Sequence, residues 1–205
     1  GNLGIGTFEG LDGEAVLLDG SVYQVKGDGS VCQPDDSLKM PFGTCTLFDD
    51  DLQRKMRGVE SFSQFGTVLE NSFEDKRIFY AIRAHGRFKT MRVRSCDKQA
   101  KPYRPLAEVT KSQHVYEYAD TVGTLVGFWT PPFVPGTIGV PGFHLHFIAD
   151  DRSKGGHVLD FSADVMNLSL DPTPRITIDF SAPVDVPFVE RDIEQQVQDA
   201  ERQRK

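Results

Sequence analysis

The sequence has few cysteines, no long apolar run and no excess of positive charge. Its three cysteines, Cys32, Cys45 and Cys96, stand far apart without C-x-x-C spacing, so we interpret them as ordinary buried or half-buried thiols. No apolar stretch approaches the roughly 20 residues that a membrane-spanning helix requires, and we therefore expect no membrane partner. The net charge is −7. Because binding to phosphates needs a basic surface, we expect no nucleic-acid partner.

The same absences bear on cellular location. An odd cysteine count without a disulfide framework favours a reducing compartment, and no signal peptide is visible, so we expect a cytoplasmic protein. The chain begins at Gly1 rather than at methionine. A secreted mature form whose leader has been removed therefore stays an open alternative.

The composition is typical of a β-rich fold. The chain has 205 residues, of which 39% are hydrophobic and 26% charged, enough for one large domain or two small ones. Its 19 glycines and 12 prolines suit short strands joined by tight turns. We predict an α+β, β-rich fold with two mixed or antiparallel sheet domains, a few short helices and a helical C-terminal tail. The Lys101–Pro105 segment is the predicted linker between residues 1–104 and residues 105–205.

Turn signals and apolar patterning place the expected elements along the chain. Besides a histidine-bearing hairpin, the predicted strands are Glu14–Leu18, Ser21–Lys26, Gly43–Phe48, Arg77–Ala84, Phe88–Arg94, Val115–Tyr118, Thr124–Trp129 and Arg175–Phe180. His85-Gly86 is expected to join two of them as a turn. Helices are expected after Asp49–Asp51, with apolar residues at 52, 56, 59 and 62, then from Pro105 or Leu106 to about Gln113, and over Arg191–Lys205.

Three of the five histidines gather in Val140–Phe161. His144 and His146 are two apart in a strand-like run, so their side chains point to the same face. A polar, glycine-ended turn at Asp150–Gly156 leads to His157, which lies opposite His146 if the hairpin loop has an even number of residues. Three converging imidazoles that leave a fourth coordination position open are the arrangement of a catalytic zinc site. His-x-His alone is a weak signal, because such residues also occur as ordinary strand histidines.

An ordered set of motifs resembles the α-acetolactate decarboxylase family over essentially the whole chain. The motifs are Gly6-Thr7-Phe8, Leu11-Asp12-Gly13-Glu14, Phe79-Tyr80-Ala81-Ile82, Arg94-Ser95, Lys98-Gln99, Lys101-Pro102-Tyr103, Gly123–Phe128, Gly142–Phe147, Asp151-Arg152 and Gly155–Phe161. Cupins also carry His-x-His on a strand, but they expect a nearby glutamate and a distant third histidine. Here Asp150 and Asp151 stand in place of that glutamate, and His157 follows too soon.

The resemblance implies an activity and a metal. It implies a Zn²⁺ enzyme, often a homodimer, that converts (S)-2-acetolactate to (R)-acetoin and CO₂ through a metal-stabilised enediolate that is protonated on one face. His144, His146 and His157 would hold the metal, which would accept the electrons left by the broken C–C bond.

The resemblance also assigns residues to the substrate. Arg94 would grip the substrate carboxylate through two parallel hydrogen bonds, although Arg92 shares its strand face and competes for that role. Glu14 would deliver the proton, and Thr7 would line the pocket.

A second carboxyl group is expected from the tail, with Glu201 as the candidate and Glu194 or Glu190 as rivals. His85 and His114 fall outside the motifs and are interpreted as ordinary polar residues. Without the resemblance, the residues alone favour ordinary roles. Arg94 would be a surface charge, Glu14 a solvated glutamate at a strand end and Thr7 an ordinary strand threonine.

Two other classes of function stay open at this stage. One is a non-catalytic, cupin-like module that binds a metal or small ligand and needs neither Arg94 nor Glu14. The other is a zinc hydrolase or hydratase, in which the metal-bound water is the nucleophile. The sequence leaves undecided the oligomeric state, the handling of the opposite enantiomer and the tolerance for 2-aceto-2-hydroxybutyrate.

Overall fold

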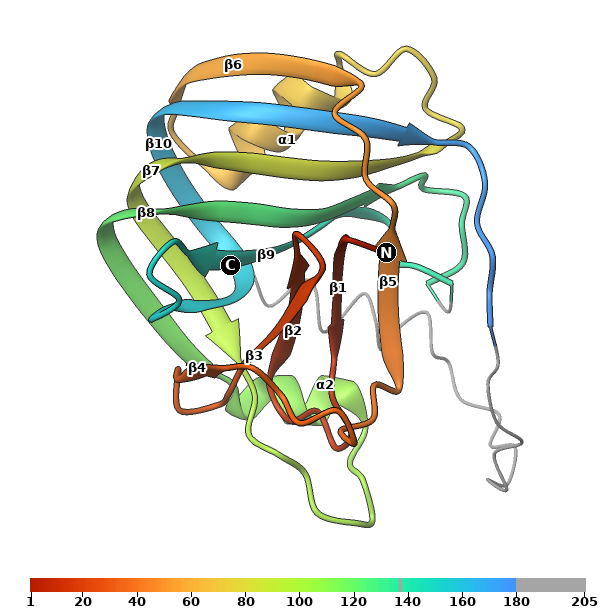
Figure 1. The fold of residues 1–205 in the computed structure, drawn as a ribbon, viewed down its shortest axis with the longest axis vertical. Coiled ribbons are helices and arrows are strands. Elements are labelled where there is room, and N and C mark those ends of the chain that lie inside the picture. Colours follow the sequence, from red (N-terminus) through yellow and green to blue (C-terminus); the bar gives the residue numbers. More distant parts are fainter. Residues whose placement is uncertain (137, 180–205) are drawn as a thin grey trace.

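The computed structural model describes residues 1–136 and 138–179, which form two five-stranded antiparallel sheets and short helices (Figure 1). The first sheet has the order β4-β3-β2-β1-β5 and contains β1 (Leu3–Thr7), β2 (Glu14–Leu18), β3 (Ser21–Val25), β4 (Val31–Cys32) and β5 (Phe42–Thr46). The second has the order β6-β10-β7-β8-β9 and contains β6 (Leu52–Val59), β7 (Phe79–Ser95), β8 (His114–Thr130), β9 (Gly142–Ala149) and β10 (Gly155–Thr173). The predicted β-rich, two-sheet α+β class is confirmed.

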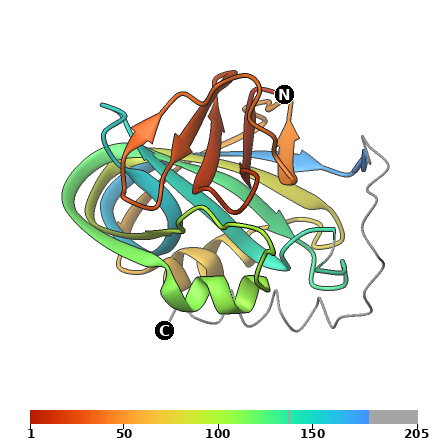
Figure 2. The same ribbon diagram turned by 90° about the horizontal axis from the view of Figure 1, so that it is seen from below.

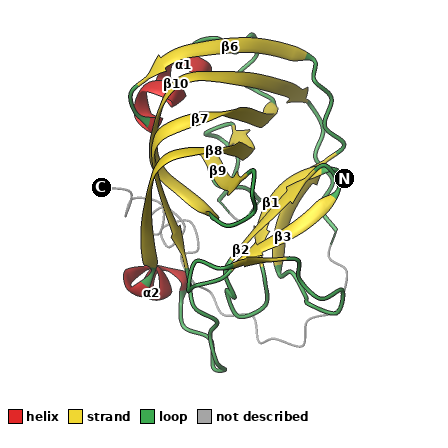
Figure 3. Ribbon diagram, turned by 60° about the vertical axis from the view of Figure 1, so that its left-hand side comes forward, coloured by secondary structure: helices red, strands yellow, loops and turns green. Residues whose placement is uncertain are grey.

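Four strands of the second sheet close into a ring. β9 pairs with β8 along its whole length and also with β10 at Gly155–His157, while β7 lies between β10 and β8. The interior of the ring holds one core cluster, with Phe88, Leu145, Phe147 and Phe161 among its fully buried side chains. The strands bend strongly to make this closure (Figure 3).

The first sheet lies as a separate layer over one side of the second (Figure 2). A second core cluster fills the contact between the layers, and it joins Leu3, Ile5, Val16 and Leu18 of the first sheet to Ala81, Val126, Phe128 and Ile148 of the second. Along β9, Leu145 and Phe147 therefore face the ring interior, whereas alternate residues face the first sheet.

The helices are short. In α1 (Phe62–Glu70), the Ser61 side chain caps the helix by accepting a hydrogen bond from the Gln64 amide at 3.1 Å. Its buried residues, including Phe62 and Phe65, pack on β10 and β6. The expected second helix is confirmed as α2 (Leu106–Val109) followed by a 3₁₀ turn at Thr110–Ser112. No helix in the described part of the chain is long and apolar enough to cross a membrane.

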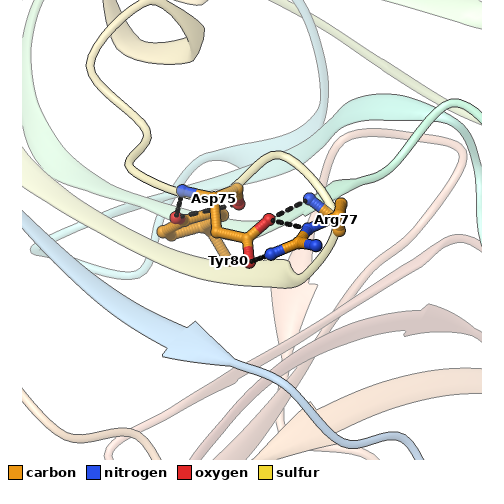
Figure 4. Close-up of polar contacts among 3 residues, drawn as sticks. All are labelled: Asp75, Arg77 and Tyr80. Carbon is orange, nitrogen blue, oxygen red and sulfur yellow. Dashed lines mark hydrogen bonds and ion pairs between the residues drawn. The ribbon is translucent and has the colours of Figure 1, made fainter.

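The connection from α1 to β7 is tied to the start of that strand (Figure 4). The Tyr80 hydroxyl donates to the Asp75 carbonyl at 3.1 Å, and the Asp75 carboxylate accepts three hydrogen bonds from Arg77. These hydrogen bonds lower the pKa of Asp75 to about 2, so its carboxylate stays charged throughout the physiological range.

The helix predicted after Asp51 is wrong. Residues 52–59 form β6, which pairs with β10 from Leu52↔Leu170 to Val59↔Ala163, and the helix begins only at Phe62. Leu52 and Met56 are four apart, a spacing that suits a helix but also puts both on one face of a strand. Because this segment pairs with the edge of β10, it forms a strand rather than a helix.

In two places the sequence predicted two short strands where the structure has one long strand. The turn expected at His85-Gly86 is therefore also wrong. β7 and β8 each run for 17 residues, and Gly86 lies within the sheet, paired with Gly123 and Met166. A Cβ at Gly86 would lie 2.7 Å from the Val165 carbonyl oxygen. This glycine therefore permits close approach of two backbones rather than a turn.

The strand expected at Arg175–Phe180 is not formed by residues 174–179, because β10 ends at Thr173 and Pro174 lacks a donor for further pairing. The predicted helical tail, Arg191–Lys205, lies outside the described residues. Strands of the first sheet end at Thr46 and those of the second begin at Leu52. The division into domains at residues 104 and 105 stays a prediction.

The aromatic core gives a first test. The Phe161 ring lies 5.4 Å from Phe65, 5.6 Å from Phe88 and 5.8 Å from Phe62, centroid to centroid. Phe161→Ala should lower the free energy of unfolding by about 3–5 kcal/mol through lost burial and a cavity. The matched control is Phe133→Ala, at a side chain that is 68% exposed, with an expected change within about 0.5 kcal/mol. Urea denaturation measures both, and equal effects would contradict this assignment of the core.

Candidate metal centre and active site

The hairpin between β9 and β10 brings the three histidines together. His146 pairs directly with His157, which confirms the loop parity assumed from the sequence. The turn is closed by hydrogen bonds from the Ala149 amide to the Lys154 carbonyl at 2.9 Å and from the Arg152 amide to the Ala149 carbonyl at 3.0 Å. Arg152 adopts a left-handed conformation, with φ of 58°. The polar loop therefore returns the chain in the register that aligns the imidazoles.

The imidazoles face one another at the contact between the two sheets. Ring centroids lie 5.2 Å apart for His144 and His146, 4.9 Å for His144 and His157, and 5.4 Å for His146 and His157. One ligand nitrogen from each ring lies within 4.8 Å of the others. His146 and His157 are buried and His144 is half-buried, so the group can hold a metal ion that is reached from the side of His144.

The surroundings of His146 fit a metal ligand. Its Nδ1 lies 2.8 Å from the Ala15 carbonyl oxygen. Because a carbonyl only accepts, Nδ1 must donate and carry the hydrogen, which leaves the lone pair of Nε2 for a metal. Metal-binding histidines commonly use their second nitrogen in this way, and the bond fixes both tautomer and ring orientation.

Glu14 and Arg94 converge on the same place from different sheets. Glu14 begins β2 and Arg94 is near the end of β7, where it pairs with His157 in the sheet. Arg94 Nη1 lies 3.7 Å from Glu14 Oε1, and Glu14 Oε2 lies 3.5 Å from His146 Nε2. Glu14 is only 8% exposed and Arg94 7%. The structure thus groups a carboxylate, a guanidinium and the histidines in one buried cluster.

Arg92 does not reach this cluster. Its Nε lies 3.5 Å from the Glu117 carboxylate, and both side chains are substantially exposed. His85 and His114 are likewise away from it. They contact Asp150 at 3.0 Å and Asp97 at 2.8 Å on the surface, in keeping with their interpretation as ordinary polar residues.

Thr7 lies beside Glu14, because the two residues pair across β1 and β2. The Thr7 hydroxyl donates a hydrogen bond to the Gly13 carbonyl at 2.8 Å. Its oxygen keeps the capacity to accept one from a ligand. The candidates Glu190, Glu194 and Glu201 lie outside the described residues.

Two further features lie near the histidines and Arg94, and the sequence assigned neither of them to the site. Cys96 is buried two residues after Arg94; burial raises the pKa of its thiol to about 11, and the charge of Glu14 adds to the rise while Arg94 opposes it. The thiol is therefore neutral at physiological pH. The second feature is a small, mainly apolar cavity beside His144, walled by both sheets and lined by Ile5, Phe42, Phe79, Phe128, Val140 and Ile176 among others. Neither feature has a local sequence signature, since both arise from contacts between strands.

Comparison with known proteins gives a consistent result. The family model described as alpha-acetolactate decarboxylase matches residues 1–195. Alpha-acetolactate decarboxylase from Brevibacillus brevis is 38% identical over 209 residues, covering 100% of this chain and 72% of the relative. The enzyme of that name from Methanosarcina mazei is 40% identical over 182 residues, covering 89% of this chain and 63% of the relative.

The solved structures agree with this result. The crystal structure of alpha-acetolactate decarboxylase from Bacillus subtilis superimposes with a TM-score of 0.85 at 33% identity, covering 98% of this chain and 87% of that one. The similarity extends over both sheets and the histidine hairpin rather than over one motif. The chain therefore belongs to the alpha-acetolactate decarboxylase family, a family of decarboxylating lyases.

Proposed function

We propose that the protein catalyses the zinc-dependent decarboxylation of (S)-2-acetolactate to (R)-acetoin and CO₂. The observation that carries this proposal is the buried cluster of three imidazoles, Arg94 and Glu14 in a chain of this family. A set of three imidazoles suits Zn²⁺ and leaves a position for substrate oxygens. Bound there, Zn²⁺ would supply a Lewis acid that accepts the electrons released when the C–C bond breaks.

Arg94 is the proposed binding group for the substrate carboxylate before it leaves as CO₂. Its guanidinium presents donors in a planar fork that matches a carboxylate, and burial strengthens such a charge-assisted contact. Pairing with His157 in the sheet keeps its backbone next to the histidines. These contacts support Arg94 over Arg92, whose side chain is on the surface with Glu117.

Glu14 is the proposed acid that protonates the enediolate after CO₂ departs. It reaches the histidines from the first sheet, whereas all three histidines belong to the second. A carboxyl group that approaches from one side delivers its proton to one face, which is what a chiral product requires. Glu201 is proposed as a second carboxyl group, with Glu194 and Glu190 as rivals, and Thr7 as a hydroxyl that accepts a hydrogen bond from the substrate.

The remaining expectations rest on the family resemblance or on composition alone. They are a homodimer, a cytoplasmic location and the division into residues 1–104 and 105–205. The alternatives, a non-catalytic metal-binding module and a zinc hydrolase or hydratase, do not require a buried arginine beside the histidines. That difference makes them separable by experiment.

The activity and its metal are tested together. Purified protein with zinc is given racemic 2-acetolactate, and CO₂ release and acetoin are followed by chiral chromatography. We expect predominantly (R)-acetoin in the early phase, complete loss of turnover after chelation and recovery on adding zinc. Only slow, racemic acetoin at the uncatalysed rate would favour the non-catalytic module. Full activity of metal-free protein would refute the role of zinc.

The histidine ligands are tested by substitution. His157→Ala should remove both zinc and activity, because two imidazoles alone do not retain the metal through dialysis. His114→Ala is the control, because the His114 side chain contacts the exposed Asp97 on the surface, and this variant should keep both properties. Metal is measured by mass spectrometry of the purified proteins. Stoichiometric zinc in the His157 variant would place the metal elsewhere.

The carboxylate site is tested by exchanging one cation for another. Arg94→Lys should keep stoichiometric zinc but lose about 100-fold in turnover, because a point charge does not reproduce the two-donor fork. Arg92→Lys is the matched control on the same strand and should stay within about twofold of the wild type. The measurement is steady-state kinetics on 2-acetolactate with parallel metal analysis. Wild-type kinetics for Arg94→Lys would move the carboxylate site to another residue.

A further inference from the structure

We propose that Gln24 is a positioning residue for this reaction, because its carboxamide holds the turn that directs Glu14 towards the histidines. The inference rests on the proposed role of Glu14 and adds a residue that the sequence motifs did not indicate. Gln24 lies on β3 and is only 3% exposed, and its carboxamide contacts Asp12 and Cys32.

The turn before Glu14 is conformationally demanding. Gly10, Leu11 and Gly13 all have positive φ, at 78°, 55° and 76°. For leucine the left-handed region is unfavourable, so this conformation persists only where surrounding contacts hold it. At Gly13 a Cβ would lie 2.1 Å from the Val25 carbonyl oxygen, which shows how closely the turn is pressed against β3.

Hydrogen bonds fix the two peptide units that lead into Glu14. Gln24 Nε2 donates to the Asp12 carbonyl at 2.7 Å. The Gly13 amide of that same peptide unit donates to the Leu11 carbonyl at 2.8 Å and to the Cys96 carbonyl at 3.2 Å. The next peptide unit is held by the Thr7 hydroxyl, which donates to the Gly13 carbonyl at 2.8 Å. Both units are therefore clamped immediately before the Cα of Glu14.

Gln24 is itself held in place by its neighbours. Its Oε1 accepts from the Cys32 thiol at 3.7 Å, and its backbone pairs with Ala15 on one side and Cys32 on the other. The carboxamide thus has one orientation, with the amino group towards Asp12. Among the groups that hold this turn, Gln24 can be altered without changing Thr7, a proposed substrate contact, or the backbone of Cys96.

Loss of this donor should release the Asp12–Gly13 peptide and let the Glu14 carboxyl group leave its place 3.5 Å from His146 Nε2. Small displacements of a reacting group have large effects on rate. The proton would then arrive from a less defined direction. The effect should fall on turnover and on the handedness of acetoin rather than on substrate binding, which is assigned to Arg94.

The test is Gln24→Met in the zinc-loaded protein. Methionine keeps the length and buried volume but has no N–H to donate. We expect stoichiometric zinc, a KM within about twofold, a turnover about tenfold lower and a reduced excess of (R)-acetoin. Thr121→Val is the control, because it removes another hydrogen bond from a buried side chain to a carbonyl, 3.2 Å long, on β8. It should lower stability without changing handedness or turnover.

A double-mutant cycle shows whether Gln24 acts through Glu14. Glu14→Gln and the double variant Glu14→Gln/Gln24→Met are assayed at high enzyme concentration to follow residual turnover. The Gln24 substitution should have no further effect in the Glu14→Gln background. The same loss in both backgrounds would overturn the proposal, as would wild-type turnover and handedness for Gln24→Met when Glu14→Gln is impaired.

Failure of the proposed function gives a different pattern, in which Glu14→Gln itself retains normal turnover and handedness. If Gln24→Met does not fold, Gln24→Asn provides the same comparison. Asparagine keeps the amide but is one methylene shorter, so it loses reach to the Asp12 carbonyl. It is expected to reduce the excess of (R)-acetoin in the same way, and an unchanged product would count against the proposal.

Discussion

The pairing of His157 with two strands at once is the constraint on which the rest of the site depends. His157 lies opposite His146 of β9 and opposite Arg94 of β7, at the point where β10 closes the ring. Gly156 allows this closure, since a Cβ there would lie 2.7 Å from the Arg94 carbonyl oxygen. A slip of one residue would send His157 to the apolar interior and separate it from the other imidazoles.

Closure also explains why the polar groups lie where they do. The interior of the ring is filled by aromatic and aliphatic side chains, so the histidines occupy the opposite face, against the first sheet. Buried polar groups must find partners, and those come from the facing layer: the Ala15 carbonyl for His146, and Glu14 for Arg94. The proposed roles divide accordingly between the two sheets. The second sheet carries the proposed metal ligands and Arg94, and the first sheet carries Glu14, the proposed acid.

Local patterns predicted elements well where turn signals mark both ends of a strand. Glu14–Leu18 was predicted with its observed bounds, and the histidine hairpin with its register. The same patterns gave a wrong prediction at Leu52 and Met56, whose spacing suits both a helix and a strand. They gave another at Gly86, where glycine permits close packing of strands rather than a turn. In both cases the neighbouring strand β10 decided the outcome, and no local pattern describes that neighbour.

The sequence by itself determined the chemistry of the hairpin, because two imidazoles two residues apart share a face and a short polar turn returns the third. Its ordered motifs also indicated the family. Those motifs already favoured Arg94 over Arg92. The tertiary structure alone brought Arg94 beside Glu14 and placed His146 against Ala15, 131 residues away along the chain. It also brought Gln24 to the turn before Glu14. The contacts of Arg94 and His146 join strands distant in sequence, and their pairing depends on the packing of whole sheets, which spacing along the chain does not encode.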